Sequence, residues 1–425
     1  MKSRIRFSGI CSFLSIVLII SASLLYLSGC SESDSPSGPS DSDEVSVSLS
    51  THSLQLGITE TYQFSASVSG GKAENVIWYV DSIMGGSSEL GTITQSNPAV
   101  YTAPDAVPTP DAVQVMAVSA DDTTSCDSCA VTVTFNTVYV NSPAGDDDIG
   151  VGGKNKPFKS ITKGLSVSGP GMEVLAAPGI YDYTTGEVFP ITVPDSVVLE
   201  GEDWESCVIR MDAETVERVN AVLINCRDCG FRKFTLEEPD AGEPVWNIAV
   251  YFSGATSARA DSIRCLERAN YAVLRVSWDD GSIVENCHFV VSDGNFYGRG
   301  VEIVFNNEDS NTILRNLTVS GYYSGLFFNY PQRTLVENCN VQGNRYGMEL
   351  CCYQDSNSQP TPDLGGGSRG STGGNDFSNN TNCGLLNSTA NVIYAMYNIW
   401  NNTPPVEGHD YCNPDSLNGG AVVTE

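Results

Sequence analysis

A six-residue pattern that recurs in the C-terminal half of the chain restricts its fold more than any other feature. The segments VENCHF, LRNLTV and VENCNV start at Val284, Leu314 and Val336, so equivalent positions lie 30 and 22 residues apart. The segment FRKFTL at 231–236 fits the same frame. Repeats of this length are single coils of a solenoid, and they must stack because one coil cannot bury an apolar face alone. The pattern therefore predicts a parallel β-helix.

A second pattern follows the first and indicates another strand in each coil. The segment SGLFF at 324–328 matches YGMEL at 346–350 and, more loosely, CGLL at 383–386. The segment NDFSNN at 375–380 recurs 23 residues later as NIWNN at 398–402. Two short strands per repeat predict stacked parallel sheets.

Stacking of equivalent positions predicts two columns of side chains. One column points into the cylinder, and its neighbour passes amide hydrogen bonds from coil to coil, because stacked strands lie about 4.8 Å apart. That spacing is too wide for a disulfide without movement, so Cys287 and Cys339 are expected to be free core thiols. The inward column is Phe234, Cys287, Leu317 and Cys339, and the amide column is Asn286, Asn316 and Asn338.

Residues 45–135 follow a different pattern, in which polar and apolar residues alternate over short segments as in antiparallel strands. The segments that stand out are LG at 56–57, YQF at 62–64, VIW at 76–78, GTI at 91–93 and YTAP at 101–104. Their order resembles the bacterial Ig-like repeats of surface proteins, and this resemblance implies a β-sandwich that serves as a spacer.

The pattern changes again at residue 136, after which two short motifs stand out. These are KPFxxI at 156–161 and PGxY at 178–181. Residues 136–205 resemble a bacterial family of unknown function whose domain opens a right-handed parallel β-helix of the pectate-lyase-like superfamily. The resemblance implies an all-β protein, with an Ig-like β-sandwich followed by a right-handed parallel β-helix at 136–425. Residues 354–374, rich in Pro, Gly and Ser, are expected to form an insertion loop.

The start of the chain predicts export. A basic beginning and an apolar run from residue 7 to 26 lead to Leu27-Ser28-Gly29-Cys30, in the order of a secretory signal. The tetrapeptide resembles the bacterial lipobox, which implies a signal peptide at 1–29 and a lipid anchor on Cys30. The alternative is a transmembrane anchor, since about 20 apolar residues can span a bilayer.

Two further features refine this prediction. Ser31 follows the cysteine, and by resemblance to the enterobacterial sorting pattern this implies the outer membrane and a possible surface position. Residues 30–44 are acidic, contain no large apolar side chain after the cysteine, and are expected to form a flexible tether.

The charge of the chain limits its partners. The formal net charge is −29 at pH 7, and removal of residues 1–29 makes it more negative, because that segment contains Lys2, Arg4 and Arg6 and no acidic residue. Such a surface repels phosphate backbones, which argues against nucleic acid as a partner. It also disfavours polyanionic glycans unless a cation such as Ca²⁺ bridges them.

The cysteines suggest local disulfides. Two C-x-x-C pairs, Cys126–Cys129 and Cys226–Cys229, lie in a chain predicted to be exported, where disulfide formation is permitted. A zinc site would need four ligands from distant segments in a sequence with three histidines. Disulfides or buried thiols are the favoured prediction, and the connectivity stays open.

Two catalytic hypotheses arise from the predicted coils. A polysaccharide lyase would need a basic side chain beside Ca²⁺, and Arg299 and Arg333 are candidates. A glycoside hydrolase would need two carboxylates across a cleft, and Asp279-Asp280-Gly281 resembles the paired aspartates of β-helical polygalacturonases. The rest of that family's motif set is missing, and Asp-Asp-Gly is also common turn chemistry. Solvated loop residues are the alternative for all four candidates.

Binding hypotheses complete the set. Asp146-Asp147-Asp148 could bind Ca²⁺, although the alternating spacing of an EF-hand loop is absent and an acidic turn is the alternative. Aromatic side chains that could stack on sugar rings, with core packing as the alternative, are Trp278, Tyr322, Tyr323 and Tyr330.

The sequence thus predicts a lipid-anchored cell-envelope protein that presents a β-helix. The favoured hypothesis is a non-catalytic module for carbohydrate binding or adhesion. A polysaccharide lyase or glycoside hydrolase is the alternative, and a purely structural envelope protein is the third.

Overall fold

A computed structural model describes ten stretches of the chain. These are residues 45–70, 75–211, 220–237, 248–266, 271–292, 294–304, 310–329, 333–351, 360–413 and 421–424. The chain divides into two compact units between Phe135 and Asn136, where the sequence pattern changes. Among the described residues, none of the helices has the length and apolar character needed to cross a membrane. The signal segment, Cys30 and the tether lie outside the described residues.

The N-terminal unit consists of short β-strands, as the alternating pattern predicts. All of its strand pairs are antiparallel except β2 with β11. The rings of Phe64 and Trp78 lie 6.0 Å apart and join the two larger sheets. One sheet is β2 (Ser53–Gly57), β11 (Cys126–Thr134), β10 (Ala112–Ser119), β5 (Val76–Val80) and β6 (Ile83–Met84); the second is β3 (Thr61–Phe64), β9 (Ala99–Thr102), β8 (Gly91–Ile93) and β7 (Gly86–Ser87); and β1 (Ser46–Leu49) pairs with β4 (Ala66–Ser69). Assignment to the Ig-like class stays a prediction.

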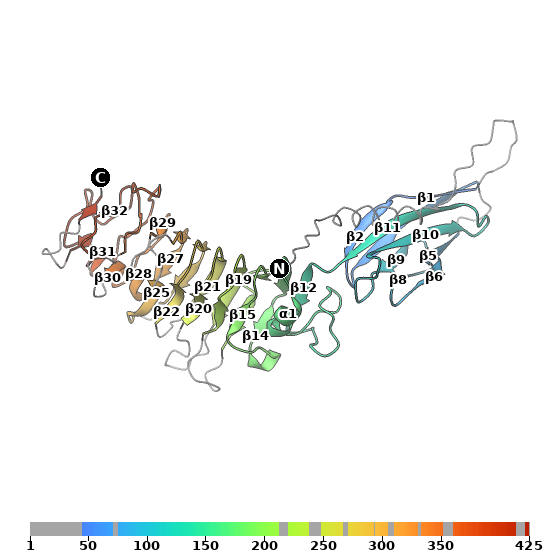
Figure 1. Ribbon diagram of the computed structural model, residues 1–425, viewed down its shortest axis with the longest axis horizontal. Helices are drawn as coiled ribbons and strands as arrows, with labels where there is room; N and C mark the ends of the chain where they lie inside the picture. The colour runs from blue at the N-terminus through green and yellow to red at the C-terminus, as the bar shows by residue number, and fades with distance from the viewer. Residues whose placement is uncertain are drawn as a thin grey trace, which may run out of the picture. The chain divides into compact units, whose positions relative to one another are not determined.

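The C-terminal unit is a parallel β-solenoid, and this confirms the main prediction from the repeats. Figure 1 shows its strands stacked side by side from β14 towards β32. Sheet I contains β12 (Thr137–Val140), β13 (Glu173–Ala176), β16 (Val198–Gly201), β19 (Gly230–Glu237), β21 (Arg259–Cys265), β23 (Ile283–Glu285), β26 (Ile313–Arg315) and β29 (Leu335–Glu337), with β14 (Gly179–Tyr181), β17 (Cys207–Arg210), β24 (His288–Val290) and β27 (Thr318–Ser320) on branches. Sheet II contains β15 (Ile191–Val193), β18 (Val222–Ile224), β20 (Ile248–Ser253), β22 (Ala272–Ser277), β25 (Tyr297–Val304), β28 (Tyr322–Asn329), β30 (Tyr346–Cys351), β31 (Cys383–Asn387) and β33 (Tyr411–Cys412). The short helices α1 (Ile161–Val167) and η1 (Tyr183–Thr185) lie near its start, and β32 (Ile393–Tyr394) pairs with β34 (Val422–Val423) near its end.

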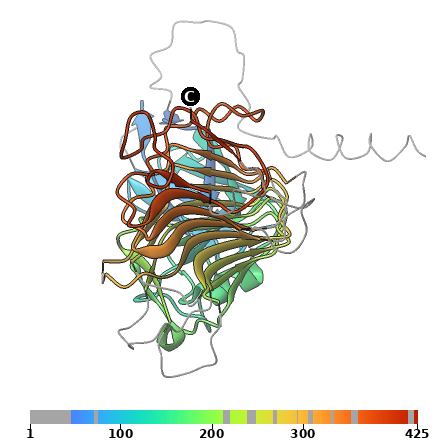
Figure 2. The same ribbon diagram turned by 90° about the vertical axis from the view of Figure 1, so that its left-hand side faces the viewer.

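The observed register matches the alignment of the repeats. Val284 pairs with Leu314, and Leu314 pairs with Val336. In sheet II, Ser324 pairs with Tyr346, which in turn pairs with Cys383. Figure 2 looks along the stack, and successive coils lie over one another. Each match in the sequence is therefore a hydrogen-bonded neighbour in space.

Every coil in this region turns the same corner in the left-handed backbone conformation. The predicted amide column forms part of this corner: Asn286, Asn316 and Asn338 have φ values of 54°, 55° and 53°. Asn316 donates its amide hydrogen to Asn286 at 3.0 Å, as the stacking argument predicts. Asparagine tolerates this conformation better than most residues, which explains its recurrence. The corresponding corner residues in the other coils are Lys233, Ser262, Gly374 and Tyr397, all with positive φ.

The inward column is also confirmed. Phe234, Cys287, Leu317 and Cys339 are each at most 1% exposed. Cys287 and Cys339 are free thiols, and burial raises the pKa of each to about 12. These thiols therefore act as small apolar side chains.

Glycine recurs in the second pattern because the coils approach closely there. A Cβ on Gly325 would lie 2.6 Å from Val341 Cγ1 and 2.7 Å from the carbonyl oxygen of Gly347. The next coil repeats the arrangement, since a Cβ on Gly347 would lie 2.5 Å from the carbonyl oxygen of Gly384. The pattern x-G-h-x-h thus marks a backbone contact between coils.

The prediction of an insertion loop at 354–374 is wrong for residues 360–374, the part that the structure describes. Asp363 bridges Leu335 and Tyr394 as a rung of the stack, and Leu364 is fully buried. The Asp363 carboxylate accepts backbone hydrogen bonds from Gly365 and Gly367, both at 3.1 Å. Side-chain capping therefore holds a Gly-rich turn within the coil. Residues 354–359 lie outside the described residues.

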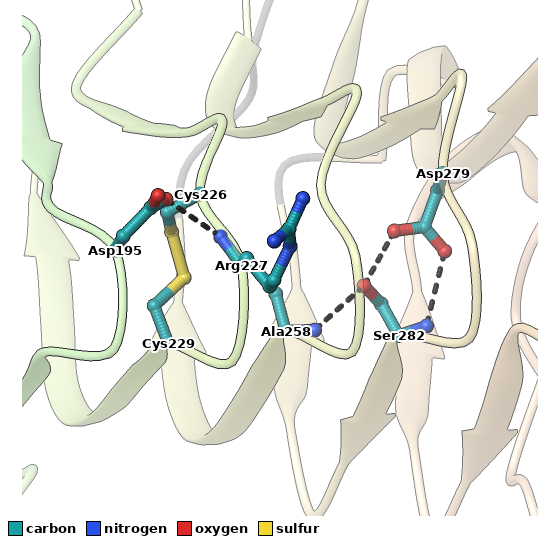
Figure 3. Close-up of a disulfide and its surroundings, with 7 residues drawn as sticks. All are labelled: Asp195, Cys226, Arg227, Cys229, Ala258, Asp279 and Ser282. Atoms are coloured by element: carbon teal, nitrogen blue, oxygen red, sulfur yellow. Dashed lines mark hydrogen bonds between the residues drawn. A yellow bond between two sulfur atoms is a disulfide. The ribbon is translucent and has the colours of Figure 1, made fainter. Parts of the chain in front are cut away.

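The two C-x-x-C pairs differ. Cys226 and Cys229 form a disulfide in the turn between β18 and β19, with a Cα–Cα distance of 6.1 Å (Figure 3). The predicted Cys126–Cys129 disulfide is wrong, because Cys129 is a buried free thiol and both residues lie on strand β11. Residues three apart in a strand are about 10 Å apart and point to opposite faces, so they cannot pair.

The shared corner leads to a stability prediction. Tyr397 adopts φ 63° where three other coils use asparagine, and a bulky residue is unfavourable there. We expect Tyr397→Asn to raise the free energy of unfolding by about 0.5–1 kcal/mol in denaturant titrations. Tyr394→Asn is the control, because Tyr394 is also exposed but lies in the extended strand β32, where asparagine is disfavoured. Destabilisation by Tyr397→Asn would contradict the prediction.

Candidate functional site

Charged side chains on the outer face of sheet I neutralise one another. Arg232 contacts Glu200 on the preceding strand and lies 3.1 Å from Glu173, and Arg315 Nε lies 2.7 Å from Glu285. Burial alone would raise the pKa of Glu200, but hydrogen bonds from Lys233 and Arg232 outweigh burial and lower it. The in-register positions are Glu200, Arg232, Asp261, Glu285, Arg315 and Glu337. These ion pairs occupy that face.

The outer face of sheet II carries a different cluster around Glu302. The register places Glu302 between Arg275 and Phe327 of the neighbouring strands. Its side chain is 3% exposed, contacts the guanidinium of Arg299 and lies 3.2 Å from Arg275 Nε. The Arg299 guanidinium lies 3.4 Å from the centroid of the Phe327 ring and covers it. A carboxylate buried between two cations requires both of them, so this cluster is a structural part of the face.

Tyrosines gather at the edge of sheet II where its strands begin. Tyr271 directly precedes β22, and Tyr297, Tyr323 and Tyr346 lie in the first two positions of β25, β28 and β30. Three of them are exposed by 57%, 66% and 38%, in the order Tyr271, Tyr297 and Tyr323. Since parallel strands begin at the same edge of a sheet, these residues lie on four successive strands at that edge. They do not occupy one equivalent position, because Tyr297 pairs with the buried Tyr322 and Tyr346 pairs with Ser324. We call these four residues the tyrosine edge.

Arg345 lies within the tyrosine edge. Its guanidinium carbon is 4.9 Å from the centroid of the Tyr323 ring and 6.0 Å from that of Tyr346, and the two rings are 5.6 Å apart. A cation over aromatic faces is held by the ring quadrupoles. The edge therefore combines apolar ring faces with hydrogen-bond donors, a combination suited to sugar rings.

Of the four aromatic residues predicted to bind sugars, the structure places one in this edge. Tyr323 belongs to it, whereas Tyr322 is 1% exposed and points into the core, so the prediction for Tyr322 is wrong. Trp278 is 61% exposed but follows the end of β22, at the opposite edge of the sheet. Tyr330 lies outside the described residues.

The structure does not bring the two candidate lyase bases together. Arg299 lies in β25 of sheet II, while Arg333 is an exposed residue just before β29 of sheet I. The guanidinium of Arg299 contacts the Glu302 carboxylate and covers the Phe327 ring, so both of its faces of interaction are already used within the sheet. Arg299 is better described as a structural cation of the Glu302 cluster.

Asp279 and Asp280 do not form a catalytic pair. Asp279 is fully buried and accepts hydrogen bonds from Ser282 N at 3.1 Å and from Ser282 Oγ (Figure 3). It also accepts one from Thr312 Oγ1 at 2.9 Å. Burial raises its pKa, and the hydrogen bonds oppose that shift. Asp280 is exposed and bridges Thr256 of the preceding coil through its backbone. The two aspartates belong to a turn, which is the alternative interpretation of Asp-Asp-Gly given above.

Two of the three candidate calcium ligands have separate structural roles. Asp146 accepts backbone hydrogen bonds from Asp148 and Ile149 within its own turn. Asp147 accepts hydrogen bonds from Lys159 N, Ser160 N and Ser160 Oγ, and Ser160 caps helix α1. Within the described ranges, no group of three or more His, Cys, Asp or Glu side chains is placed to hold a metal ion. The acidic turn is thus the observed arrangement.

Sequence reasoning missed most of the tyrosine edge, although a signal was present. Tyr323 and Arg345 each stand two residues before the glycine of the repeated x-G-h-x-h pattern, at Gly325 and Gly347. A search for residues two positions before that glycine in each coil would have found both Tyr323 and Arg345. Tyr271 and Tyr297 belong to coils in which the pattern is weak.

By its fold, the C-terminal unit is a parallel β-solenoid whose outer faces carry aligned side chains from successive coils. A family model described as a protein of unknown function (DUF1565) matches residues 144–227 and 276–407, about half of the chain. The chain belongs to this family, which confirms the resemblance noted for residues 136–205. No curated protein matches the sequence.

Several solved structures are similar in fold. Pectate lyase Pel9A is 13% identical with a TM-score of 0.46, over 68% of this chain and 78% of that chain. A rhamnogalacturonan lyase is 13% identical with a TM-score of 0.42, over 68% and 84%. Pectin methylesterase PemA from Erwinia chrysanthemi is 12% identical with a TM-score of 0.34, over 66% and 93%. At these identities the likeness concerns the fold alone.

The structural role of Asp279 is testable. Asp279→Ala leaves the Ser282 N–H and the Thr312 hydroxyl without their buried acceptor, and we expect it to lower the free energy of unfolding by about 2–4 kcal/mol in denaturant titrations. Asp280→Ala, at the exposed neighbour, is the control and is expected to change it by less than about 0.5 kcal/mol. Equal effects of the two substitutions would contradict this assignment.

Proposed function

We propose that this protein is a non-catalytic carbohydrate-binding module and that a glycan binds along the tyrosine edge. The observation that carries the proposal is the recurrence of tyrosine at the same edge on four successive strands, with Tyr271, Tyr297 and Tyr323 exposed. Tyrosine offers an apolar face to a sugar ring and a hydroxyl to its polar groups. Because four successive strands begin at this edge, it offers several such faces on neighbouring coils, as a polysaccharide chain requires.

The contacts at the centre of sheet II support binding rather than catalysis. Glu302 is held between Arg275 and Arg299, and Glu349 accepts a hydrogen bond from Ser324 Oγ at 2.5 Å. These groups fix each other's orientation, which suits a rigid recognition surface.

Glycoside hydrolysis is the second candidate, and one observation favours it. Glu302 and Glu349 lie at equivalent outward positions with the strand of Phe327 between them. Two strand spacings place their carboxylates about 9.6 Å apart, near the upper limit for an inverting pair. Binding remains favoured because Glu302 is only 3% exposed and is held between Arg275 and Arg299, which leaves it little access to a substrate.

We further propose that the N-terminal unit is an Ig-like spacer and that Cys30 anchors the chain to the outer membrane by lipid. The signal-like start and the acidic tether support this arrangement. A spacer and tether would hold the solenoid away from the bilayer, where an extracellular glycan is accessible.

Glycan binding can be tested with residues 31–425 on an array of neutral and acidic polysaccharides. For any glycan bound by the wild type, we expect Tyr297→Ala and Tyr323→Ala each to weaken binding about tenfold, because a stacking face is lost. Tyr394→Ala, a substitution of an exposed tyrosine away from the edge, is the control and should leave affinity unchanged. Absence of binding to every glycan would favour the purely structural alternative.

The hydrolase alternative calls for a separate assay. We expect no release of reducing ends from the polysaccharides of the same panel, with or without Ca²⁺. Release that is lost in Glu349→Gln would replace the binding proposal with the catalytic one, and calcium-dependent release would indicate a lyase.

The anchor is tested by location. In full-length protein expressed in a bacterium with an outer membrane, we expect Cys30→Ala to prevent incorporation of labelled fatty acid and to shift the protein out of the outer-membrane fraction. Cys11→Ala is the control within the signal and should leave both unchanged. Labelling that persists without Cys30 would contradict the anchor.

A further inference from the structure

We propose that Arg345 binds the carboxylate of an acidic sugar residue that occurs at intervals in an otherwise neutral glycan. The inference rests on the proposed function and deepens it, because it names the chemical class of the ligand. It is carried by the contacts of Arg345 and by the charges that surround it.

The guanidinium of Arg345 differs from those beside it. Arg275 and Arg299 both contact the carboxylate of Glu302. The exposed Arg345 lies over the rings of Tyr323 and Tyr346, and within the described part of the chain no carboxylate lies at ion-pair distance from it. The cation is therefore positioned by aromatic contacts while its charge lacks an anionic partner.

Such an arrangement suits a carboxylate. Ring contacts use the face of the guanidinium and leave the N–H groups at its rim, where two of them can donate in parallel to a carboxylate. Stacking also restricts the side chain before binding, so less conformational entropy is lost when the ligand arrives. A sugar ring stacked on Tyr323 would bring an acidic substituent within reach of Arg345.

The surrounding charge limits how acidic the ligand can be. The chain carries −29 overall, and Glu349 occupies an outward position on strand β30, next to Phe327. Charges closer than the Debye length of about 8 Å repel with little screening. A glycan with an acid on every residue would meet the Glu349 carboxylate and the net negative charge of the chain, whereas one with isolated acids can direct each acid to Arg345.

The test compares matched probes that differ by one group. Methyl β-glucuronide is compared with methyl β-glucoside, and methyl α-galacturonide with methyl α-galactoside, by NMR titration of residues 31–425. We expect at least one uronide to bind about ten- to a hundredfold more tightly than its neutral partner, the range for a charge-assisted bidentate contact. Arg345→Gln should abolish that preference, so that the uronide binds no more tightly than its neutral partner.

Two controls separate the contribution of this site from general charge effects. Arg333→Gln removes one exposed positive charge from the other sheet and should leave the preference intact. A fully acidic oligogalacturonate should bind no more tightly, per chain, than the single galacturonide.

Each remaining outcome counts against the proposal. If no uronide binds more tightly than its neutral partner, if the preference survives in Arg345→Gln, or if the oligogalacturonate binds far more tightly, Arg345 is not a carboxylate subsite of this kind. Should a neutral polysaccharide still bind and depend on Tyr297 and Tyr323, the proposed function stands and the acidic subsite alone fails. Absence of binding to every monosaccharide and polysaccharide rejects both.

Discussion

In-register hydrogen bonding between parallel coils is the constraint on which this structure depends. Each strand satisfies its backbone groups on the coils before and after it, so every coil must turn its corners at the same place. The left-handed corner recurs at Asn286, Asn316 and Asn338 because a non-glycine residue needs a short polar side chain to adopt that backbone readily. The close contact at Gly325 has the same origin, since neighbouring backbones leave no room for a Cβ.

The same constraint turns each outer face into ladders of aligned side chains. Adjacent positions lie about 4.8 Å apart, so a side chain interacts first with its equivalents in the neighbouring coils. On sheet I this produces ion pairs such as Arg315 with Glu285. On sheet II it brings Arg275 beside Glu302, and successive strands begin with tyrosines at the same edge. The position of a residue in the coil, more than its type, decides whether it serves stability or remains available to a ligand.

The errors of sequence reasoning follow from this point. Asp279 and Asp280 are adjacent in the sequence, yet one caps a buried turn and the other faces solvent, because neighbouring side chains alternate between inside and outside. Tyr322 and Tyr323 divide in the same way. The Gly-rich stretch near Asp363 lacks periodicity but still forms a rung, because a carboxylate replaces the missing strand contacts. Composition and motif alone could not separate these cases.

The sequence by itself determined the parallel β-solenoid, the register of its repeats and the buried column of Cys287 and Cys339, because stacked coils repeat the same local requirements at each equivalent position. It also determined the antiparallel strand pattern before residue 136. Only the tertiary structure decided which charged groups neutralise one another and which stay accessible, as the contrast between Arg299 and Arg345 illustrates. The contacts of Arg275 with Glu302 and of Arg345 with Tyr323 join different coils, so the pairing depends on distances in space that the repeat pattern does not contain.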